Sequence, residues 1–282
     1  MIDTPTAFEI VPMTPDHLDQ ALALSQAIDW PYRREDWEIA LRLGRGFAVE
    51  QGGECVGTAL WWAYDPDYAT VGMIIVADKA QRQGIGARLM TALLDDARGR
   101  TLILNSTAEG QVLYTRTGFV AYDAVHQHQA VLQAASEPDP SVSLRPATAA
   151  DREALLAIDR AGSGMGRQQL VDALVRNGET LVVERDGGIT GYGIVRRWGR
   201  GVVVGPVVAS APEEARALIA ALAARHVGTF VRIDVFASTG FSGWLEGLGL
   251  PQVGRVVTMA RGNPPSRDNA VTLYALANQS LG

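Results

Sequence analysis

The chain has 282 residues, of which 47% are hydrophobic and 20% are charged, so it is long and apolar enough for two globular domains. A formal net charge of −6 argues against a general nucleic-acid-binding protein, because such proteins carry a basic face. The single cysteine, Cys55, excludes an intrachain disulfide, and we expect it to be a small buried apolar residue. No apolar run is long enough to span a bilayer and the first residues show no secretion signal, so we expect a cytoplasmic protein that does not enter the membrane.

The first half has an order of elements that is typical of a mixed α/β fold. Apolar periodicity predicts two helices after a first strand, then a meander of three strands, and then helices and strands in alternation. This order favours an α/β fold built on a mixed sheet of the α+β kind. The predicted elements are strand 8–12, helices 14–28 and 33–43, strands 46–51, 55–64 and 69–76, helix 84–98, strand 101–105, helix 108–116, and strands 119–124 and 127–133.

Two glycines stand where a strand passes into a helix. Val71–Val76 has the pattern of a buried strand, and apolar residues at helical spacing begin at Ala87. Gly84 and Gly86 therefore lie at a helix N-terminus, where the first backbone N–H groups have no partner within the helix and the helix dipole is positive. Because glycine lets an anion approach this backbone closely, the pattern predicts a phosphate-binding loop.

The surroundings of this loop make the pattern more specific. The spacing Q-x-x-G-x-G that starts at Gln81 is followed by a strand, Thr101–Asn105, and then by Tyr114, four residues before a Gly-Phe pair. Over residues 8–132 the chain resembles the GNAT superfamily of acyl-CoA-dependent N-acyltransferases. In that family the loop holds the CoA pyrophosphate and the tyrosine lies beside the CoA sulfur. The resemblance implies acetyl-CoA as co-substrate, bound by the loop residues Gln81, Arg82, Gln83, Gly84, Ile85, Gly86 and Ala87.

The two halves of the chain resemble each other on either side of a linker. The linker, residues 134–141, contains two prolines and no periodicity. Phe47–Gly57 matches Leu181–Gly191, and Pro12–Thr14 matches Pro146–Thr148, both at an offset of 134 residues. The repeat predicts two tandem GNAT folds.

The second half departs from the first at two positions that matter for the cofactor. In place of the glycine loop it has Glu213 and Glu214, whose carboxylates would satisfy the helix dipole and repel a pyrophosphate. In place of Tyr114 it has Leu245, which has no hydroxyl. We therefore expect a second half that binds no CoA.

These comparisons define two predicted domains. We expect residues 1–134 to form the acyl-CoA-binding, catalytic GNAT domain, and residues 141–282 to form a degenerate GNAT-like domain without a phosphate loop. Two such folds in one chain make a pseudo-dimer, which allows the protein to be a monomer. The apolar tail over residues 271–281 is expected to pack, at a place that the sequence does not specify.

The resemblance also implies which residues contact the reacting part of acetyl-CoA. In the GNAT fold the strand before the loop parts from its neighbour, so that the backbone at Met73, Ile74 and Val76 would bind the pantetheine arm. Tyr114 would protonate the departing thiolate, since a tyrosine with its ordinary pKa of about 10 is protonated at neutral pH. Packing is the alternative role for Tyr114. Asn105 is expected either to bind the cofactor or substrate or to cap the following turn.

A general base is not visible in the sequence. The strand 71–76 carries no acid, although many GNAT enzymes have a glutamate there. A water chain ending on a residue of the second half, or on one of three acids of the first, would replace it: Asp65, Asp67 or Glu109. The resemblance to one tandem-GNAT subfamily leaves open that the tail brings the Gly282 carboxylate into the site, although nothing in the sequence requires it. His126 and His128 alternate on one late strand, and a solvated pair is expected rather than a base or a metal site, because no third ligand is in sight. We expect no metal.

Aromatic residues gather where the acceptor pocket lies in the resembled fold. Trp30 and Tyr32 lie at the break between the first two helices, and Trp62 lies on a strand opposite them. We expect these three residues to contact the substrate. Strand alternation places Trp61 and Trp62 on opposite faces, so one of the two is expected in the core.

The leading functional prediction is an N-acetyltransferase that transfers an acetyl group from acetyl-CoA to a primary amine of a small molecule. One alternative is a protein lysine or N-terminal acetyltransferase, which would need an open, acidic groove. A second is a non-catalytic acyl-CoA-binding protein. A Rossmann dinucleotide-binding protein is disfavoured, because the third glycine and the acid after the next strand are missing.

Overall fold

The structure, a computed structural model, describes residues 8–282. The first half folds into the predicted elements, with bounds that differ by a few residues. They are β1 (Phe8–Pro12), η1 (Pro15–His17), α1 (Leu18–Ala27), α2 (Arg34–Leu43), β2 (Arg45–Gln51), β3 (Glu54–Tyr64), β4 (Tyr68–Val76), η2 (Asp78–Ala80), α3 (Ile85–Asp96), β5 (Thr101–Ser106), α4 (Gln111–Arg116) and β6 (Val120–Val131). One prediction is wrong, because the two last strands expected over 119–124 and 127–133 form the single strand β6.

The second half repeats this order and adds one strand at its end. Its elements are β7 (Leu144–Pro146), η3 (Ala149–Asp151), α5 (Arg152–Ser163), α6 (Gln168–Asn177), β8 (Gly178–Arg185), β9 (Gly188–Trp198), β10 (Gly201–Ala209), α7 (Pro212–Ala224), β11 (Phe230–Phe236), η4 (Ala237–Thr239), α8 (Ser242–Gly247), β12 (Gln252–Arg261) and β13 (Thr272–Ala275). The extra strand, β13, belongs to the tail.

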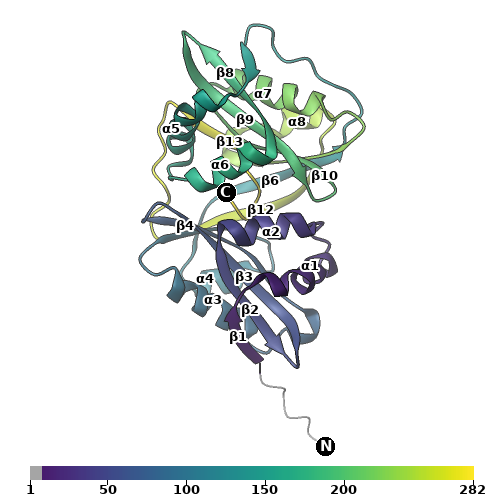
Figure 1. Cartoon of the computed structure of the whole chain (residues 1–282), viewed down its shortest axis with the longest axis vertical. Coiled ribbons are helices and arrows are strands. Elements are labelled where there is room, and N and C mark those ends of the chain that lie inside the picture. Colours follow the sequence, from purple (N-terminus) through teal and green to yellow (C-terminus); the bar gives the residue numbers. More distant parts are fainter. Residues whose placement is uncertain (1–7) are drawn as a thin grey trace, which may run out of the picture.

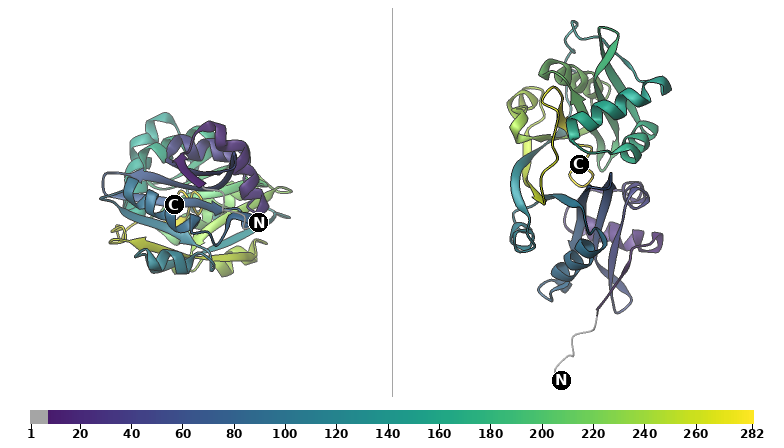
Figure 2. Two further views of the ribbon diagram at one scale, coloured as in Figure 1. Left: turned by 90° about the horizontal axis from the view of Figure 1, so that it is seen from below. Right: turned by 90° about the vertical axis from the view of Figure 1, so that its left-hand side faces the viewer.

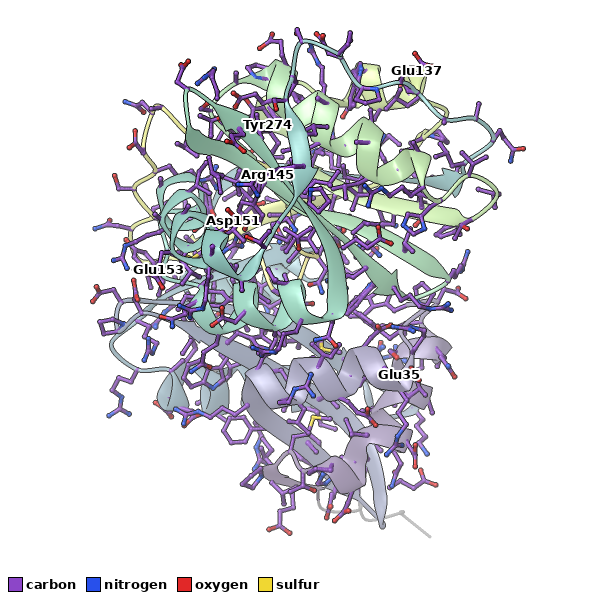
Figure 3. All side chains as sticks on the ribbon, turned by 45° about the horizontal axis from the view of Figure 1, so that its top comes forward. Glu35, Glu137, Arg145, Asp151, Glu153 and Tyr274 are labelled. Atoms are coloured by element: carbon purple, nitrogen blue, oxygen red, sulfur yellow. The ribbon has the colours of Figure 1, made fainter. Side chains whose placement is uncertain are left out.

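The repeat extends to the way in which each half starts its first helix. The backbone N–H of Thr14 donates to Nδ1 of His17 (3.0 Å), and the N–H of Thr148 donates to Oδ2 of Asp151 (2.6 Å). Each bond satisfies a donor that the helix start leaves free. In the second half Arg145 adds an ion pair to Asp151 (2.8 Å), and the two side chains lie together in Figure 3.

The two halves share one sheet and exchange a strand. Its thirteen strands lie in the order β1-β2-β3-β4-β5-β12-β6-β11-β13-β10-β9-β8-β7. β12 of the second half pairs with β5 of the first, and β6 of the first half pairs with β11 of the second, all antiparallel. β6 is one long strand because two strands of the second half together pair with its whole length, β12 with residues 120–128 and β11 with residues 125–131. The exchange joins the halves through backbone hydrogen bonds.

The strands of the first half separate beside the glycine loop. β4 and β5 pair in parallel only from Tyr68 to Thr70, so the rest of β4 has no strand on that side. β4 also carries a bulge, where the backbone of Met73 has a φ of +52°, a left-handed conformation that is uncommon for a residue with a branched or long side chain. Thr58 Oγ1 donates to the Met73 carbonyl across the bulge (2.8 Å).

The corresponding opening in the second half is filled by the tail. β10 and β11 pair at Val202 and Val203 and then separate. β13 enters between them and pairs antiparallel with both strands, with Ala275 opposite Val207 on one side and Val235 on the other. The tail therefore packs as a strand in the second half, and it ends at the junction of the halves (Figure 2, right).

Helices cover both faces of the sheet (Figure 1). In the first half α1 and α2 pack together on the Trp62 face of β3, and α3 packs on the Trp61 face. The core under α1 and α2 continues into the core under α5 and α6 of the second half, which includes Leu170 and Tyr192. The halves thus share an apolar core as well as a sheet.

Candidate active site

The predicted phosphate loop folds as a helix start that is open to solvent. Gly84 is the N-cap of α3 and has a left-handed backbone (φ +81°), and a Cβ built at this position would meet no atom within 4 Å. Arg88 N–H makes the first helical bond, to the Gly84 carbonyl (3.1 Å), and the first turn contains no acid. The N–H groups of Ile85, Gly86 and Ala87, which come before this bond in the first turn of α3, have no partner within the helix and can bind an anion. Gln81 Nε2 bonds to the Val76 carbonyl (3.2 Å) and so ties the loop to the end of β4.

The matching helix of the second half has its own anion. The Glu214 carboxylate lies at the start of α7, is 4% exposed, and accepts bonds from Ser210 N–H (3.2 Å) and Thr190 Oγ1 (2.8 Å). Arg185 pairs with the same carboxylate (3.1 Å). A phosphate would have to displace this network and approach a negative charge.

A cavity of about 650 Å³ joins the open side of β4, the start of α3 and the junction of the halves. It is lined by both predicted and unpredicted residues. Nine of the residues predicted to bind the cofactor or the substrate or to act as the acid line it: Met73, Ile74, Val76, Gln81, Gly86, Asn105, Tyr114, Trp30 and Tyr32. Of the other loop residues, Arg82, Gln83, Gly84 and Ala87 are exposed beside it, whereas Ile85 is buried in the core under α3.

Tyr114 lies on α4, which faces the cavity next to the glycine loop. Its ring packs edge-on against Phe119, with ring centroids 6.0 Å apart. Burial raises the pKa of its hydroxyl to about 12. The hydroxyl is therefore protonated at any pH near neutrality, as a proton donor must be.

Asn105 lies at the end of β5, where its side-chain amide is engaged by the second half. Its Nδ2 donates to the carbonyl of Gln279 (2.8 Å), and its Oδ1 accepts from Thr258 Oγ1 (2.7 Å). These bonds tie β5 to the tail and to β12. The residue caps no turn with its side chain, and a contact with the cofactor or substrate stays a prediction.

Trp62 requires a correction, because it does not line the cavity. Its side chain is 1% exposed and packs in the core under α1 and α2, where Nε1 donates to the Ala40 carbonyl (2.8 Å). Trp61 is also buried, on the other face, with its Nε1 bonded to Asp96 (2.8 Å). Both tryptophans are core residues, since both faces of β3 are covered by helices.

The aromatic lining of the cavity instead comes from both halves. Tyr32 packs edge-on against Trp198, at the end of β9, with ring centroids 5.2 Å apart, and against Trp30 at 6.0 Å. Burial raises the pKa of the Tyr32 hydroxyl, and a hydrogen bond to Ser280 partly offsets this. Trp198 carried no signal in the sequence, because its approach to Tyr32 depends on how the halves meet.

The tail supplies the part of the cavity wall that sequence reasoning missed. Asn278, Gln279 and Ser280 line the cavity together with Arg232 and Gln127. The Asn278 side chain accepts the N–H groups of Ser280 and Leu281 through Oδ1 (2.8 Å each), which folds the tail into a turn. A polar turn after an apolar strand was the available sequence signal, and it did not show where the tail lies.

A buried cluster of the second half holds the end of this turn. Arg167, 1% exposed, pairs with Asp159 (2.6 Å) and donates through Nη1 to the main-chain oxygen of Gly282 (2.7 Å). Tyr192 also donates to Asp159 (2.5 Å), and Tyr64 of the first half donates to the Leu281 carbonyl (2.6 Å). The position of the tail in the cavity is thus fixed from both halves.

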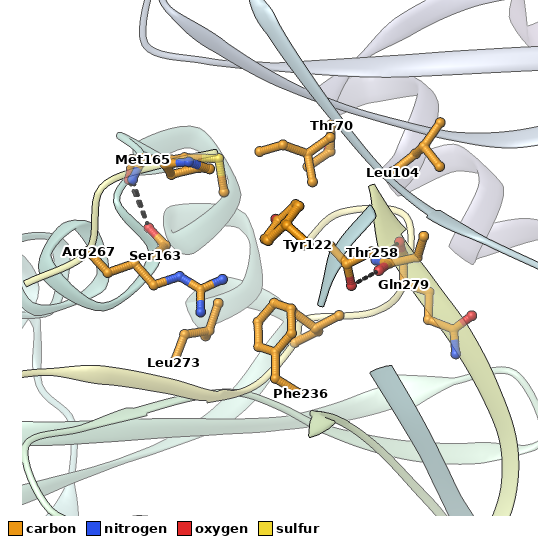
Figure 4. A pocket seen from close by; sticks show the side chains of 15 residues that line it. Thr70, Leu104, Tyr122, Ser163, Met165, Phe236, Thr258, Arg267, Leu273 and Gln279 are labelled. Carbon is orange, nitrogen blue, oxygen red and sulfur yellow. Dashed lines mark hydrogen bonds between the residues drawn. The ribbon is translucent and has the colours of Figure 1, made fainter. Parts of the chain in front are cut away.

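A second, smaller pocket adjoins the tail turn on its far side (Figure 4). Tyr122, Phe236 and Leu273 surround it with apolar surface, and Thr258 lines it with its hydroxyl bonded to the Asn105 side chain of β5 (Figure 4). This pocket is too small for a cofactor, and we assign it no role in the reaction.

The acids named as candidate bases lie in different places. Glu109 lines the cavity beside α4, and hydrogen bonds to its own N–H and to Thr107 lower the pKa of its carboxyl group. Asp65 is paired with Arg160 (2.8 Å) and, like Asp67, is not part of the cavity lining. Asp29, which the sequence reasoning did not single out, does line it.

The two late histidines are not a solvated pair. His128 is fully buried, with Nδ1 bonded to the Leu250 carbonyl (2.8 Å) and Nε2 3.1 Å from Ser242 Oγ. His126 Nδ1 contacts the same hydroxyl at 2.7 Å. The correction follows from the strand exchange, which places α8 over this part of β6.

Within residues 8–282 no three His, Cys, Asp or Glu side chains are arranged to hold a metal, and no helix is long and apolar enough to cross a membrane.

Comparisons with known proteins agree with this geometry. Residues 13–119 match the model of the Acetyltransferase (GNAT) family, and residues 155–275 match that of the Acetyltransferase (GNAT) domain. The chain belongs to the GNAT superfamily. It contains two GNAT domains in tandem, and its fold is the mixed α/β fold of that superfamily, as the sequence predicted.

Three relatives show how far the similarity extends. The uncharacterized N-acetyltransferase YitH of Bacillus subtilis is 26% identical over 235 residues, which cover 80% of this chain and 82% of YitH. A Pyrococcus horikoshii protein assigned as an acetyltransferase has a similar structure (TM-score 0.81, 22% identity, 98% and 96% of the two chains). A tandem GNAT protein from the clavulanic acid biosynthesis pathway has a TM-score of 0.65 at 16% identity, over 91% and 99% of the two chains. The two structures support the fold, and YitH supports an acetyltransferase.

Proposed function

We propose that the first half of this tandem GNAT protein binds acetyl-CoA and transfers the acetyl group to a primary amine of a small molecule. The observation that carries the proposal is the meeting of two features in one cavity: the unpaired edge of β4 and the open start of α3. An extended pantetheine arm can add to the strand edge by backbone hydrogen bonds while the pyrophosphate binds the helix amides. The second half offers neither feature.

The contrast between the halves supports a single cofactor site. In the second half β13 occupies the strand opening, and Glu214 occupies the helix start. We therefore assign residues 1–134 to acyl-CoA binding and catalysis, and residues 141–282 to completing the cavity. The second half contributes to the acceptor side of that cavity through Trp198, Arg232 and the tail.

Tyr114 is the residue proposed to move a proton. As the amine nitrogen bonds to the thioester carbonyl carbon, the carbon–sulfur bond breaks and the thiolate leaves. The Tyr114 hydroxyl, which lines the cavity and is held protonated by burial, donates its proton to that sulfur. The amine proton leaves by a route to which we assign no residue.

The shape of the cavity favours a small acceptor over a protein. Its acceptor side is lined by the aromatic pair of Tyr32 and Trp198 and by the tail turn, so the acceptor would bind between the two halves, where a small molecule fits more readily than a lysine within a folded segment. The protein-acetyltransferase alternative needs an open groove at this place.

Two measurements test the proposal together. Calorimetry with acetyl-CoA should show binding, and a panel of small amines should include acceptors that release free CoA, detected by its thiol. Acetyl-CoA binding without CoA release from any amine or peptide would favour the non-catalytic alternative. Faster release with lysine peptides than with any small amine would favour protein acetylation.

A further inference from the structure

On the acceptor side of the cavity, two hydrogen-bond donors have no acceptor among the described residues. Arg232 lines the cavity, and its Nε and Nη2 bond to Asp234 (2.9 and 3.2 Å), which leaves Nη1 without a bond to the described residues. Asp234 is in turn shared with Gln279 Nε2 (3.0 Å). The oxygens of Asp234 therefore have hydrogen-bond partners, whereas the guanidinium of Arg232 keeps one unbonded nitrogen, Nη1.

Asn278 presents a second unmatched donor at the same wall. Its side chain lines the cavity and is 2% exposed, and its Oδ1 is occupied by the N–H groups of the tail turn. Its Nδ2 is buried without any partner in the described chain. A buried amide N–H₂ without a partner is costly, so such a group usually has a ligand or water to bind.

Arg196 adds a buried charge directly behind this wall. It is 4% exposed, its guanidinium carbon is 4.6 Å from the centroid of the Trp198 ring, and Nη2 donates to the carbonyl of Ala277, the neighbour of Asn278 (2.8 Å). Its Nε and Nη1 have no partner within residues 8–282. Burial without a paired carboxylate lowers the pKa of Arg196 to about 10, which still leaves it charged at neutral pH.

The other charges near Arg196 are already paired with one another. Asp36 is fully buried, pairs with Arg33 (2.7 Å) and accepts the Gly199 N–H (2.9 Å). Asp234 is held by Arg232. The positive charge of Arg196 therefore remains uncompensated in a region of low dielectric, where its field reaches the cavity wall with little screening.

We propose that the amine acceptor also carries an anionic group, a carboxylate or a phosphate, which binds between Arg232 Nη1 and Asn278 Nδ2 in the field of Arg196. The proposal rests on the proposed acetyltransferase function and assigns the chemical class of its acceptor. The aromatic rings of Tyr32 and Trp198 lie beside this position and contact the body of the acceptor. The amine end points toward Tyr114, on the side where β4 is open.

Matched acceptors test the charge requirement. An α-amino acid with an aromatic side chain is compared with its carboxamide, and phosphoethanolamine with ethanolamine, with CoA release as the readout. We expect kcat/KM to be at least roughly tenfold higher for the anionic member of one pair, and the preferred pair distinguishes carboxylate from phosphate. Equal or higher kcat/KM for both neutral members, with CoA release intact, would overturn the inference and leave the acetyltransferase function standing.

One isosteric variant tests the site itself. Asn278→Asp keeps the oxygen that accepts the tail N–H groups and replaces the unmatched donor by a negative oxygen. We expect it to lower kcat/KM for the anionic acceptor at least tenfold and to leave the neutral partner within about threefold. Asn263→Asp, on an exposed loop, is the matched control. Equal losses for both acceptors would show a structural role only and overturn the assignment of Asn278.

A binding measurement separates failure of this inference from failure of the proposed function. Calorimetry on the CoA-loaded protein compares the N-acetylated amino acid with its N-acetylated carboxamide. Tighter binding of the acid, lost in Arg196→Met, supports the anion site even if no amine releases CoA. Equal binding of the two compounds overturns it.

Discussion

Nη1 of Arg167 lies 2.7 Å from the main-chain oxygen of Gly282, so a buried arginine of the second half fixes the tail turn that lines the cavity of the first. Arg167 is itself neutralised by Asp159, which also accepts the Tyr192 hydroxyl. The second GNAT domain thus has a structural role that requires no cofactor of its own. It holds part of the wall of the cavity in which we propose that the acceptor binds.

The first prediction concerns the glycine loop. Gly84→Asp should abolish most acetyl-CoA affinity while the fold survives, because it adds a negative charge where the pyrophosphate approaches and meets no atom of the protein. Gly99→Asp is the matched control, since Gly99 also has a left-handed backbone (φ +87°) and open space around it. Calorimetry checks the result. Unchanged affinity in Gly84→Asp, or an equal loss in both variants, would remove the loop assignment.

The second prediction is a stoichiometry of one CoA per chain. β13 fills the strand opening of the second half and Glu214 fills its helix start, so both parts of a second site are occupied by the chain itself. Calorimetric titration, or mass spectrometry under native conditions, gives the number. Two molecules per chain would contradict the assignment of the second half.

The third prediction concerns Tyr114. Tyr114→Phe should lower kcat at least tenfold and change acetyl-CoA affinity little, since general acid catalysis is typically worth about 10²–10⁴-fold and the ring is retained. Tyr122→Phe serves as the control, because burial also raises the pKa of Tyr122 to about 12, and it lies in the small adjoining pocket. A normal kcat with a lowered melting temperature would instead support a packing role for Tyr114.

The fourth prediction is the pH dependence that goes with this role. A hydroxyl with a pKa raised to about 12 stays protonated as the pH rises to 10, so the donor is present across that range. Tyr114→Phe should therefore lower the whole kcat profile between pH 6 and pH 10 without moving its midpoints. An alkaline limb below pH 10 that disappears in the variant would show that Tyr114 titrates there and that the assignment of its protonation state is wrong.

The fifth prediction concerns the anchoring of the tail. Tyr64→Phe removes the bond from the Tyr64 hydroxyl to the Leu281 carbonyl and should lower the free energy of unfolding by about 1 kcal/mol. It should also raise the KM for the acceptor while leaving acetyl-CoA affinity unchanged, because the tail lines the acceptor side of the cavity. Denaturant unfolding and steady-state kinetics check the two parts. Loss of acetyl-CoA affinity instead would place the tail at the cofactor.

The parts of the site that could be predicted are those encoded over short stretches of sequence. The glycine loop and Tyr114 are separated by one helix and one strand, and local periodicity places each of them on its element. Trp198, Arg232 and Asn278 reach the cavity only because β12 and β6 exchange places and the tail crosses the junction. Such contacts depend on pairing between distant strands, which local patterns do not encode.

The errors have the same origin. His128 was expected in a solvated pair with His126 because no third metal ligand was in sight, but α8 of the other half covers it. Trp62 was expected at the acceptor because it lies on a strand opposite Trp30 and Tyr32. Strand alternation alone does not show that helices cover both faces of β3. In each case the sequence predicted the strand but did not show which helix packs on its face.

The strand exchange also constrains how the chain can reach this structure. β5 gains its second neighbour only from β12, so the first half keeps an unpaired sheet edge until residues 252–261 have been synthesised and docked. During synthesis on the ribosome this edge is open to pairing with other nascent chains. Cutting the chain in the linker would therefore yield two halves whose sheets each lack strand neighbours that the other half supplies.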